Sequence, residues 1–320
     1  MNIKVGNTPL IKIKYNYNNK ENYIYAKLES YNLTGSIKDR VAYYMIKEAY
    51  KSGELKQGME IVEATSGNTG IALAAMGSYF GNPVHIFMPD WVSVERLNLM
   101  KMYNAKVTLV SKEEGGFQKA ISMAKEYAKT NNSYLTNQFE NENNVLAHYE
   151  TTGKEILDSL QNNIGGFVSG IGTGGTLIGI AKRLKESDSN IKIYALEPDK
   201  MPLLSQGKIL GDHKIEGIGD DFIPKIVDKN LIDEVITIND DDAVNMARKV
   251  ALQLGIGIGI SSGANLIASI IKSENVQKPI VTVFADDNKK YLSTTLSDAI
   301  DNNENFISNQ IKILDYEFVS

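Results

Sequence analysis

Cysteine is absent from this 320-residue chain, and histidine occurs only three times, at His85, His148 and His213. The absence of cysteine excludes disulfides and thiolate metal sites. Because the three histidines lie far apart in the sequence, we expect neither a histidine-rich metal centre nor a Ser-His-Asp triad. No metal ion is therefore predicted for the functional site.

Strong net charge and long apolar runs are also missing. The formal net charge is −5 and charged residues make up 23% of the chain, which does not favour a nucleic-acid or membrane partner. Apolar runs such as 71–76 are far shorter than the about 20 residues of a membrane span. Residues 1–5 lack the pattern of a secretory signal. We therefore expect a cytoplasmic protein with no nucleic-acid and no membrane partner.

Short β-branched runs alternate with amphipathic helical patterns, and the 42% apolar content suits one large or two medium domains. Strands are predicted at 61–65, 84–88, 106–110, 133–136, 166–169, 191–196, 235–238 and 279–284. Helices are predicted at 69–80, 93–103, 116–129, 152–160, 175–185, 241–254 and 264–272. This alternation indicates parallel sheets joined by right-handed crossovers. Two such blocks predict an α/β fold with two domains and a cleft between them.

Two glycine-rich loops lie between a predicted strand and a predicted helix, where ligands bind in open α/β sheets. The first, Thr65-Ser66-Gly67-Asn68-Thr69-Gly70, offers hydroxyls and backbone N–H groups that suit a carboxylate, although a capped helix start is an equally good interpretation. The second, 170–176, matches a G-x-G-x-x-G dinucleotide motif, with Glu197 about 20 residues later. The same loop also suits the phosphate of a smaller cofactor.

Two further residues, Ser261 and Lys38, each have a structural and a functional interpretation. Ser261, in the loop 259–264, either caps a helix or binds a heterocycle nitrogen. Lys38 follows Ser36, which can cap a helix through Val41 and Ala49. A lysine near a helix start is electrostatically disfavoured. This cost is explained if the amine is desolvated and bound as an imine; otherwise Lys38 is a solvated surface charge.

The order and spacing of seven motifs resemble the cysteine synthase and cystathionine β-synthase family, whose members are fold type II pyridoxal 5'-phosphate enzymes. The resemblance runs from about Gly6 to about Ser297. It favours the small-cofactor interpretation of the loop 170–176 over the dinucleotide one. The motifs are Asn7-Thr8-Pro9-Leu10, Ser36-Ile37-Lys38-Asp39-Arg40, Thr65 to Gly70, Asn137-Gln138-Phe139, Gly172 to Thr176, Glu216-Gly217-Ile218-Gly219 and Ser261-Ser262-Gly263.

The resemblance implies a cofactor, pyridoxal 5'-phosphate, and a role for each motif. Lys38 would form the internal aldimine and then act as the acid and base at Cα. A neutral Ser261 would face the pyridine nitrogen and moderate the electron sink, and Asn68 would contact the ring hydroxyl. The phosphate would be held by Gly172, Thr173, Gly174, Gly175 and Thr176. The substrate would be bound by Thr65, Ser66, Gly67, Asn68, Thr69, Gln138 and Gly217.

The implied architecture is that of the tryptophan synthase β-like fold, with two domains that each hold a mostly parallel twisted sheet flanked by helices. The smaller domain would span 36–148, and the larger one 1–35 plus 149–320. The smaller domain would close over the substrate and exclude water. A homodimer acting on small amino-acid substrates is expected from the family. The tail 301–320 turns apolar at 311–319 and is expected to pack on the body or on a partner subunit.

The implied reaction is a β-replacement through an aminoacrylate, which makes cysteine and acetate from O-acetylserine and sulfide. Two segments depart from typical cysteine synthases. The run Glu216 to Asp221 is more similar to cystathionine β-synthases, and 285–291 replaces a Ser-Gly-Glu-Arg-Tyr type stretch. An extra carboxylate near the cleft would repel hydrosulfide and orient a water or accept a thiol proton. Asp220 or Asp221 is thus a candidate acid/base, unless both only cap a turn.

Two alternatives to cysteine synthesis therefore stay open. The same chemistry can start from cysteine, releasing sulfide before water, cysteine or homocysteine adds, as in a cysteine lyase, a lanthionine synthase or a cystathionine β-synthase. The pair Asp220 and Asp221 favours this alternative. A regulatory family member with little turnover is the other, and the intact Lys38 argues against it.

Overall fold

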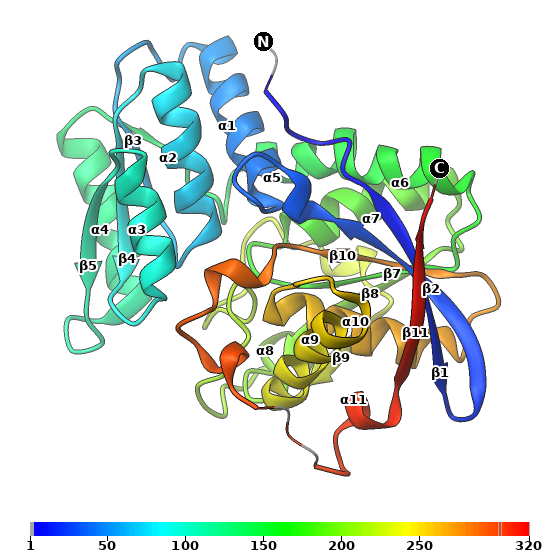
Figure 1. Cartoon of the computed structure of the whole chain (residues 1–320). Helices are drawn as coiled ribbons and strands as arrows, with labels where there is room; N and C mark the ends of the chain where they lie inside the picture. Colours follow the sequence, from blue (N-terminus) through cyan, green and yellow to red (C-terminus); the bar gives the residue numbers. More distant parts are fainter. Residues whose placement is uncertain (1–2, 300, 302, 320) are drawn as a thin grey trace.

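The computed structural model describes residues 3–299, 301 and 303–319. Within these residues the strands form two sheets, with four strands in the order β5-β4-β3-β6 and seven in the order β11-β1-β2-β10-β7-β8-β9. Figure 1 shows the smaller sheet with α1–α4 on one side of the molecule and the larger sheet with the later helices on the other. Residues 1, 2, 300, 302 and 320 of the predicted larger domain lie outside the described residues.

The four-stranded sheet is parallel throughout and buried between helices. Its strands are β3 (Ile61–Ala64), β4 (Val84–Pro89), β5 (Lys106–Val110) and β6 (Tyr134–Leu135). Helices α1 (Lys38–Ser52), α2 (Asn68–Phe80) and α3 (Val94–Met102) pack on the Ile61 face. Helix α4 (Gly116–Thr130) packs on the Val62 face. Every residue of β3 and β4 is therefore buried, as expected for a parallel sheet covered on both faces.

The seven-stranded sheet combines a parallel part with an antiparallel edge. Strands β10 (Ile280–Phe284), β7 (Gly166–Gly170), β8 (Lys192–Pro198) and β9 (Glu234–Ile238) are parallel to one another. β10 also pairs in parallel with β2 (Lys20–Leu28), which forms a hairpin with β1 (Leu10–Tyr17). β11 (Lys312–Phe318) closes the edge antiparallel to β1 (Figure 1).

Helices also cover both faces of this larger sheet. On one face lie α6 (Gly153–Leu160) and α7 (Gly175–Ser187), preceded by α5 (Glu142–Ala147) and a π-helical turn, η2 (His148–Thr152). The other face packs on α9 (Asp240–Leu254) and α10 (Ile260–Ser273). The predicted α/β class with two mostly parallel sheets is confirmed. The domain limits 36–148 and 1–35 plus 149–320 stay a prediction.

Several local features differ from the expectations. The hairpin β1–β2, turned by Asn18 and Asn19 at positive φ, had not been predicted. The tail packs on the body as β11, where no strand had been predicted. Helix α10 begins four residues earlier than predicted, so Ser261 lies in its first turn. Ser93 lies just before α3 and not inside it, and its hydroxyl donates to the carbonyl oxygen of Lys290 (2.8 Å) instead of capping the helix.

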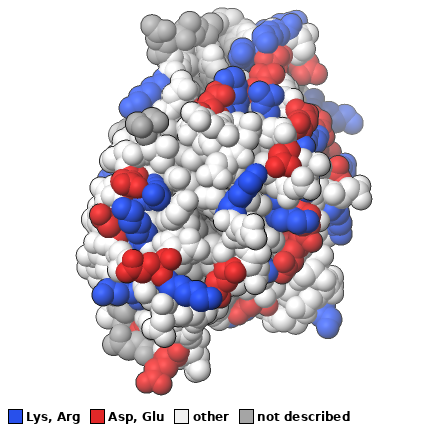
Figure 2. Space-filling model, turned by 90° about the vertical axis from the view of Figure 1, so that its right-hand side faces the viewer, with Lys and Arg blue, Asp and Glu red and all other residues white. Residues whose placement is uncertain are grey.

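The surface carries both signs of charge. Figure 2 shows basic and acidic side chains interspersed on one face of the molecule. At the edge of the larger sheet, Lys12 of β1 pairs with Glu317 of β11 at 3.0 Å. Among the described helices, none has the length and hydropathy needed to cross a membrane.

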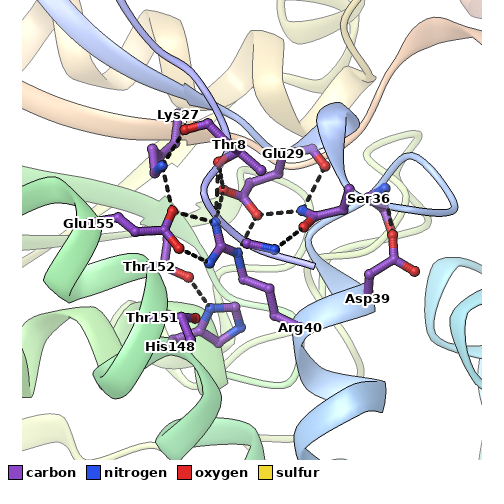
Figure 3. Close-up of polar contacts among 12 residues, drawn as sticks. Thr8, Lys27, Glu29, Ser36, Asp39, Arg40, His148, Thr151, Thr152 and Glu155 are labelled. Atoms are coloured by element: carbon purple, nitrogen blue, oxygen red, sulfur yellow. Dashed lines mark hydrogen bonds and ion pairs between the residues drawn. The ribbon is translucent and has the colours of Figure 1, made fainter. Parts of the chain in front are cut away.

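A buried ionic cluster joins α1 to the larger sheet (Figure 3). The fully buried Arg40 donates from Nε to Glu29 (2.7 Å) and from Nη1 to Glu155 (2.6 Å). Lys27 of β2 pairs with the second oxygen of Glu155 at 2.6 Å. Although burial opposes ionisation, Arg40 holds the pKa of Glu155 at about 2. The cluster therefore fixes the first turn of α1, which begins at Lys38, against β2 and α6.

We expect Arg40→Met to lower the free energy of unfolding by about 3–5 kcal/mol, because it leaves the carboxylate of Glu29 buried and unpaired. Urea denaturation followed by circular dichroism measures this loss. The matched control is Lys154→Met, which breaks the exposed pair with Asp158 on α6 and is expected to cost about 1 kcal/mol or less. Equal losses in the two variants would contradict the assigned importance of the buried cluster.

Candidate active site

A cavity lies between the two sheets, where loops from both meet. Of the residues predicted from the sequence for the site, Gly175 and Asp221 are not in the described lining of this cavity. Gly175 instead packs so closely on α5 that a Cβ there would collide with the side chain of Asn144. The predicted residues that the cavity brings together are Lys38, Thr65, Ser66, Gly67, Asn68, Thr69, Gln138, Gly172, Thr173, Gly174, Thr176, Gly217, Asp220 and Ser261.

Lys38 enters the cavity from the first residue of α1. Ile37 is the residue that directly precedes the helix. Ser36, one residue earlier, accepts a hydrogen bond at its hydroxyl from the backbone N–H of Lys38 (3.3 Å). Burial lowers the pKa of the Lys38 amine, and the carboxylates of Asp286 and Asp220 oppose this shift. A lowered pKa enlarges the fraction of neutral amine, which is the form that attacks a carbonyl group.

The loop Thr65 to Thr69 presents donors at the start of α2. Among the described residues, no side chain caps this helix, so its first N–H groups face the cavity region. The Thr65 hydroxyl accepts from the N–H of Gly67 (3.2 Å). The Thr69 hydroxyl donates to Gln138 Oε1 (2.7 Å), and Gln138 Nε2 donates to the carbonyl oxygen of Ala64 (3.1 Å). Such a set of donors suits a carboxylate.

Glu63 supports this loop and was not identified from the sequence. Its buried carboxylate accepts from the N–H of Ala64 (2.8 Å), the N–H of Gln138 (2.9 Å) and the Thr136 hydroxyl (2.6 Å). Burial raises the pKa of Glu63 to about 7 despite these hydrogen bonds. The signal available in the sequence was an acidic residue inside an otherwise apolar strand, 61–64.

The second loop leads into α7, whose N-terminus faces the cavity. Gly174 precedes the helix at φ +89°, and the N–H of Gly175 donates to the Thr173 hydroxyl (3.4 Å). A Cβ on Gly172 would collide with the carbonyl oxygen of Gly217, so only glycine fits there. The Thr173 hydroxyl accepts from Asn144 Nδ2 (2.9 Å), and the Thr176 hydroxyl lies 3.2 Å from His148 Nε2. Free N–H groups at a helix N-terminus suit a phosphate.

Two further observations bear on this loop. The carboxylate of Glu197 is engaged by the N–H groups of Leu204 (2.8 Å) and Ser205 (3.1 Å), so it does not serve a dinucleotide ribose. His148 is fully buried, and burial together with Arg40 and Lys38 lowers its pKa well below the usual value. A neutral His148 therefore positions Thr176, and this role was not identified from the sequence.

The structure separates Asp220 from Asp221. Asp220 lines the cavity together with Lys38, and burial and the charge of Asp221 raise its pKa to about 7, against the effect of Lys38. Asp221 is exposed and accepts from Gln118 Nε2 of α4 (2.7 Å). Of the two carboxyl groups, Asp220 is thus the one that lies in the cavity with Lys38.

Polar contacts also bridge the mouth of the cavity. The buried Arg96 of α3 pairs with Glu216, in the loop that carries Gly217. Its neighbour Glu95 accepts from the N–H (2.9 Å) and the hydroxyl (2.6 Å) of Ser293. These contacts hold helices of the smaller sheet against loops of the larger one.

The chain matches the family "Pyridoxal-phosphate dependent enzyme" over residues 1–286. It belongs to this family. This chain is 43% identical to cysteine synthase B of Campylobacter jejuni, and the match covers 91% of this chain and 96% of that protein. The resemblance seen in the sequence and its cofactor are therefore confirmed.

Solved structures of related enzymes agree in fold. A hydrogen sulfide-producing enzyme from Fusobacterium nucleatum is 50% identical with a TM-score of 0.93, covering 97% of this chain and 95% of that one. An aspartate-to-asparagine mutant of a hydrogen sulfide-producing enzyme, solved with an α-aminoacrylate intermediate, matches with a TM-score of 0.94. Cysteine synthase from Entamoeba histolytica is 40% identical with a TM-score of 0.87, covering 96% of this chain and 92% of that one.

The residues of the cavity fit pyridoxal 5'-phosphate. The start of α7 next to Gly174 suits the phosphate, and Lys38 suits the aldehyde because burial favours its neutral amine. Asn68 Oδ1 is buried and has no hydrogen-bond partner among the described residues, as expected where a ligand completes the site. The individual roles assigned to these residues stay predictions.

We expect Gly172→Ala to weaken binding of pyridoxal 5'-phosphate by about tenfold or more, because its Cβ displaces the loop of Gly217. Titration of the apoprotein with the cofactor, followed by absorbance, measures the dissociation constant. Gly211→Ala is the control, because its Cβ meets nothing within 4 Å in the described structure. Unchanged affinity in Gly172→Ala would argue against this loop as the phosphate site.

Proposed function

We propose that this enzyme replaces the β-substituent of a small amino acid, with Lys38 moving the proton at Cα. The observation that carries the proposal is the placement of the partly buried Lys38 in one cavity with an anion-binding loop and a phosphate-type helix start. When bound, pyridoxal 5'-phosphate supplies the electron sink that such chemistry needs.

The protein's own residues bind and orient the substrate in this proposal. Thr65, Ser66 and Thr69 hold the substrate carboxylate, and Gln138 is fixed beside them by Glu63. Ser261, in the first turn of α10, presents a neutral hydroxyl to the ring nitrogen, which favours loss of the β-substituent. The pairing of Arg96 with Glu216 keeps the smaller sheet closed over the cavity and excludes water.

Cysteine synthesis from O-acetylserine and sulfide is the first candidate reaction. The similarity to cysteine synthases from two organisms, over nine-tenths of the chain, supports it. The anion-binding loop and the proton shuttle Lys38 suffice for this reaction, because acetate leaves without protonation by an acid.

A reaction that starts from cysteine and releases sulfide is the second candidate, and Asp220 favours it. A cysteine thiolate would have to leave as S²⁻, so its sulfur needs a proton to leave as hydrosulfide, and the following nucleophile has to lose one. With a pKa near 7, Asp220 exists in both protonation states near neutral pH, so it can give the first proton and accept the second. Water, cysteine or homocysteine as the nucleophile would give serine, lanthionine or cystathionine.

We expect Asp220→Asn to slow sulfide release from cysteine by about 100-fold or more, because the leaving sulfur loses its proton donor. Sulfide is measured with cysteine as the sole substrate. Asp221→Asn, at the exposed neighbour that contacts Gln118, is the control and is expected to keep near wild-type rates. Rapid acetate release from O-acetylserine by an enzyme that leaves cysteine untouched would exclude the second candidate.

The pH dependence gives an independent check on Asp220. Because its pKa is raised to about 7, the protonated donor is lost as pH rises through about 7. The rate of sulfide release is therefore expected to fall across this range in the wild-type enzyme. In Asp220→Asn the residual rate is expected to lack this fall, and the same profile in both proteins would contradict the role.

The assembly and location also belong to the proposal. We infer a cytoplasmic homodimer from the family resemblance described for the sequence. Light scattering coupled to gel filtration tests the dimer, since it predicts twice the mass of the chain; a monomer at micromolar concentration would contradict it.

A further inference from the structure

Asp286 is a buried carboxylate that the proposed reaction does not use. It lies two residues after the end of β10, in the segment 285–291 that departs from typical cysteine synthases. It is 1% exposed, and its Oδ2 accepts from Asn68 Nδ2 (2.7 Å) and from the Tyr291 hydroxyl (2.7 Å). In the described part of the chain, its Oδ1 has no hydrogen-bond partner although it is buried.

The hydrogen bond to Asn68 fixes the orientation of an amide in the cavity. An ionised carboxylate can only accept hydrogen bonds, so the Nδ2 atom of Asn68 has to face Asp286. The amide oxygen then points away from Asp286, and it is the buried Oδ1 atom without a partner within the described residues. Because Asn68 lines the cavity as the first residue of α2, Asp286 decides which of its atoms the cofactor meets.

Asp286 is also the charged group that most strongly opposes the effect of burial on the pKa of Lys38, followed by Asp220. The backbone of Asp286 pairs with Ser36 in an isolated antiparallel bridge, two residues before Lys38. The other charged groups around this carboxylate are Lys290, whose amine donates to the carbonyl oxygen of Gly35 (2.9 Å), and Arg96, which stacks on Tyr291 at 4.6 Å.

The carboxylate of Asp286 packs closely against Gly259. Gly259, the residue before α10, donates its N–H to the backbone oxygen of Asp286 (3.2 Å). A Cβ on Gly259 would collide with Asp286 Oδ1, so only glycine leaves room for the carboxylate. The N-terminus of α10 favours negative charge at this place. Asp286 is therefore held between α1, α2 and α10, the three helices whose starts carry Lys38, Asn68 and Ser261.

We propose that Asp286 is a positioning residue that fixes the Asn68 amide toward the cofactor and keeps a negative charge beside the amine of Lys38. The proposal rests on the cofactor site described above, and it assigns to the altered segment 285–291 a role in tuning the reactive lysine. Removing the charge stabilises the neutral amine. Removing the acceptor frees the Asn68 amide to rotate.

The test uses covalent capture of pyridoxal 5'-phosphate by the apoprotein, which requires the neutral amine of Lys38. The rate is measured by absorbance across a range of pH values. In Asp286→Asn the half-maximal rate is expected at a pH lower by about one unit or more, because an opposing negative charge has been removed. The dissociation constant of the cofactor is expected to rise by about fivefold, because an amide at position 286 can present either its oxygen or its nitrogen to Asn68 and no longer enforces one orientation.

A matched control and a second variant separate this role from a structural one. Asp287→Asn removes the charge of the neighbouring carboxylate, which accepts from the N–H of Lys289 (3.1 Å). This variant is expected to keep the wild-type dependence of the capture rate on pH. Gly259→Ala displaces the carboxylate without changing Asp286 and is expected to shift the profile in the same direction as Asp286→Asn. If Asp286→Asn does not fold, Gly259→Ala decides the question.

Two results would overturn the proposal: an unshifted capture profile in the folded Asp286→Asn or Gly259→Ala protein, or an equal shift in Asp287→Asn. Failure of the underlying cofactor site is distinguished by Lys38→Ala. If this variant still captures the cofactor covalently, then the site assignment is wrong, whatever Asp286 does.

Discussion

The ion pair of the buried Arg40 with Glu29 and Glu155 is the interaction on which the position of the reactive lysine depends. The buried carboxylate of Glu29, the partly buried carboxylate of Glu155 and Lys27 surround the guanidinium, so the first turn of α1 cannot shift without leaving a charge uncompensated. Lys38 lies two residues before Arg40 on the same turn. In Figure 3, His148 lies beside the same cluster, held through Nδ1 by the hydroxyl of Thr152 (2.9 Å). Because His148 also contacts Thr176, buried polar groups lie behind both the lysine and the proposed phosphate loop.

Burial acts in opposite directions on the two groups that are proposed to move protons. It lowers the pKa of the Lys38 amine and raises the pKa of the Asp220 carboxyl to about 7, so it favours the neutral form of each group. Each limits the shift of the other because their charges are opposite. The cavity between the two sheets allows this arrangement, since helix starts and loops from both sheets meet there.

The sequence was sufficient for the architecture but not for the network that supports the site. Strands 61–64 and 84–89 were predictable because strands covered on both faces are continuously apolar. The edge strand β11 was missed because its pairing with β1 joins residues about 300 positions apart, as in Ile11 with Phe318. The hairpin β1–β2 is local and was missed although Asn18 and Asn19, between two runs of strand-forming residues, are a turn signal. The cavity residues were predictable only through family motifs.

The supporting residues could not be predicted, because their importance depends on contacts made in three dimensions. In the sequence, Glu63 is only an acidic residue in a strand. Its supporting role becomes visible through its contacts with Thr136 and Gln138. Asp286 likewise becomes informative only through Asn68, which lies 218 residues earlier. Conversely, Asp220 and Asp221 are equivalent in the sequence, and only the fold places one in the cavity and the other in solvent.

The central claim is that Lys38 binds the cofactor covalently, and borohydride reduction followed by peptide mass spectrometry tests it most directly. Reduction makes the bond between lysine and cofactor permanent, so the modified residue can be sequenced. The account predicts a single pyridoxyl group, on Lys38. Trypsin does not cleave after a modified lysine, so Lys38 is expected inside a tryptic peptide and not at its end. A pyridoxyl group on another lysine, or none on the reduced holoenzyme, would contradict it.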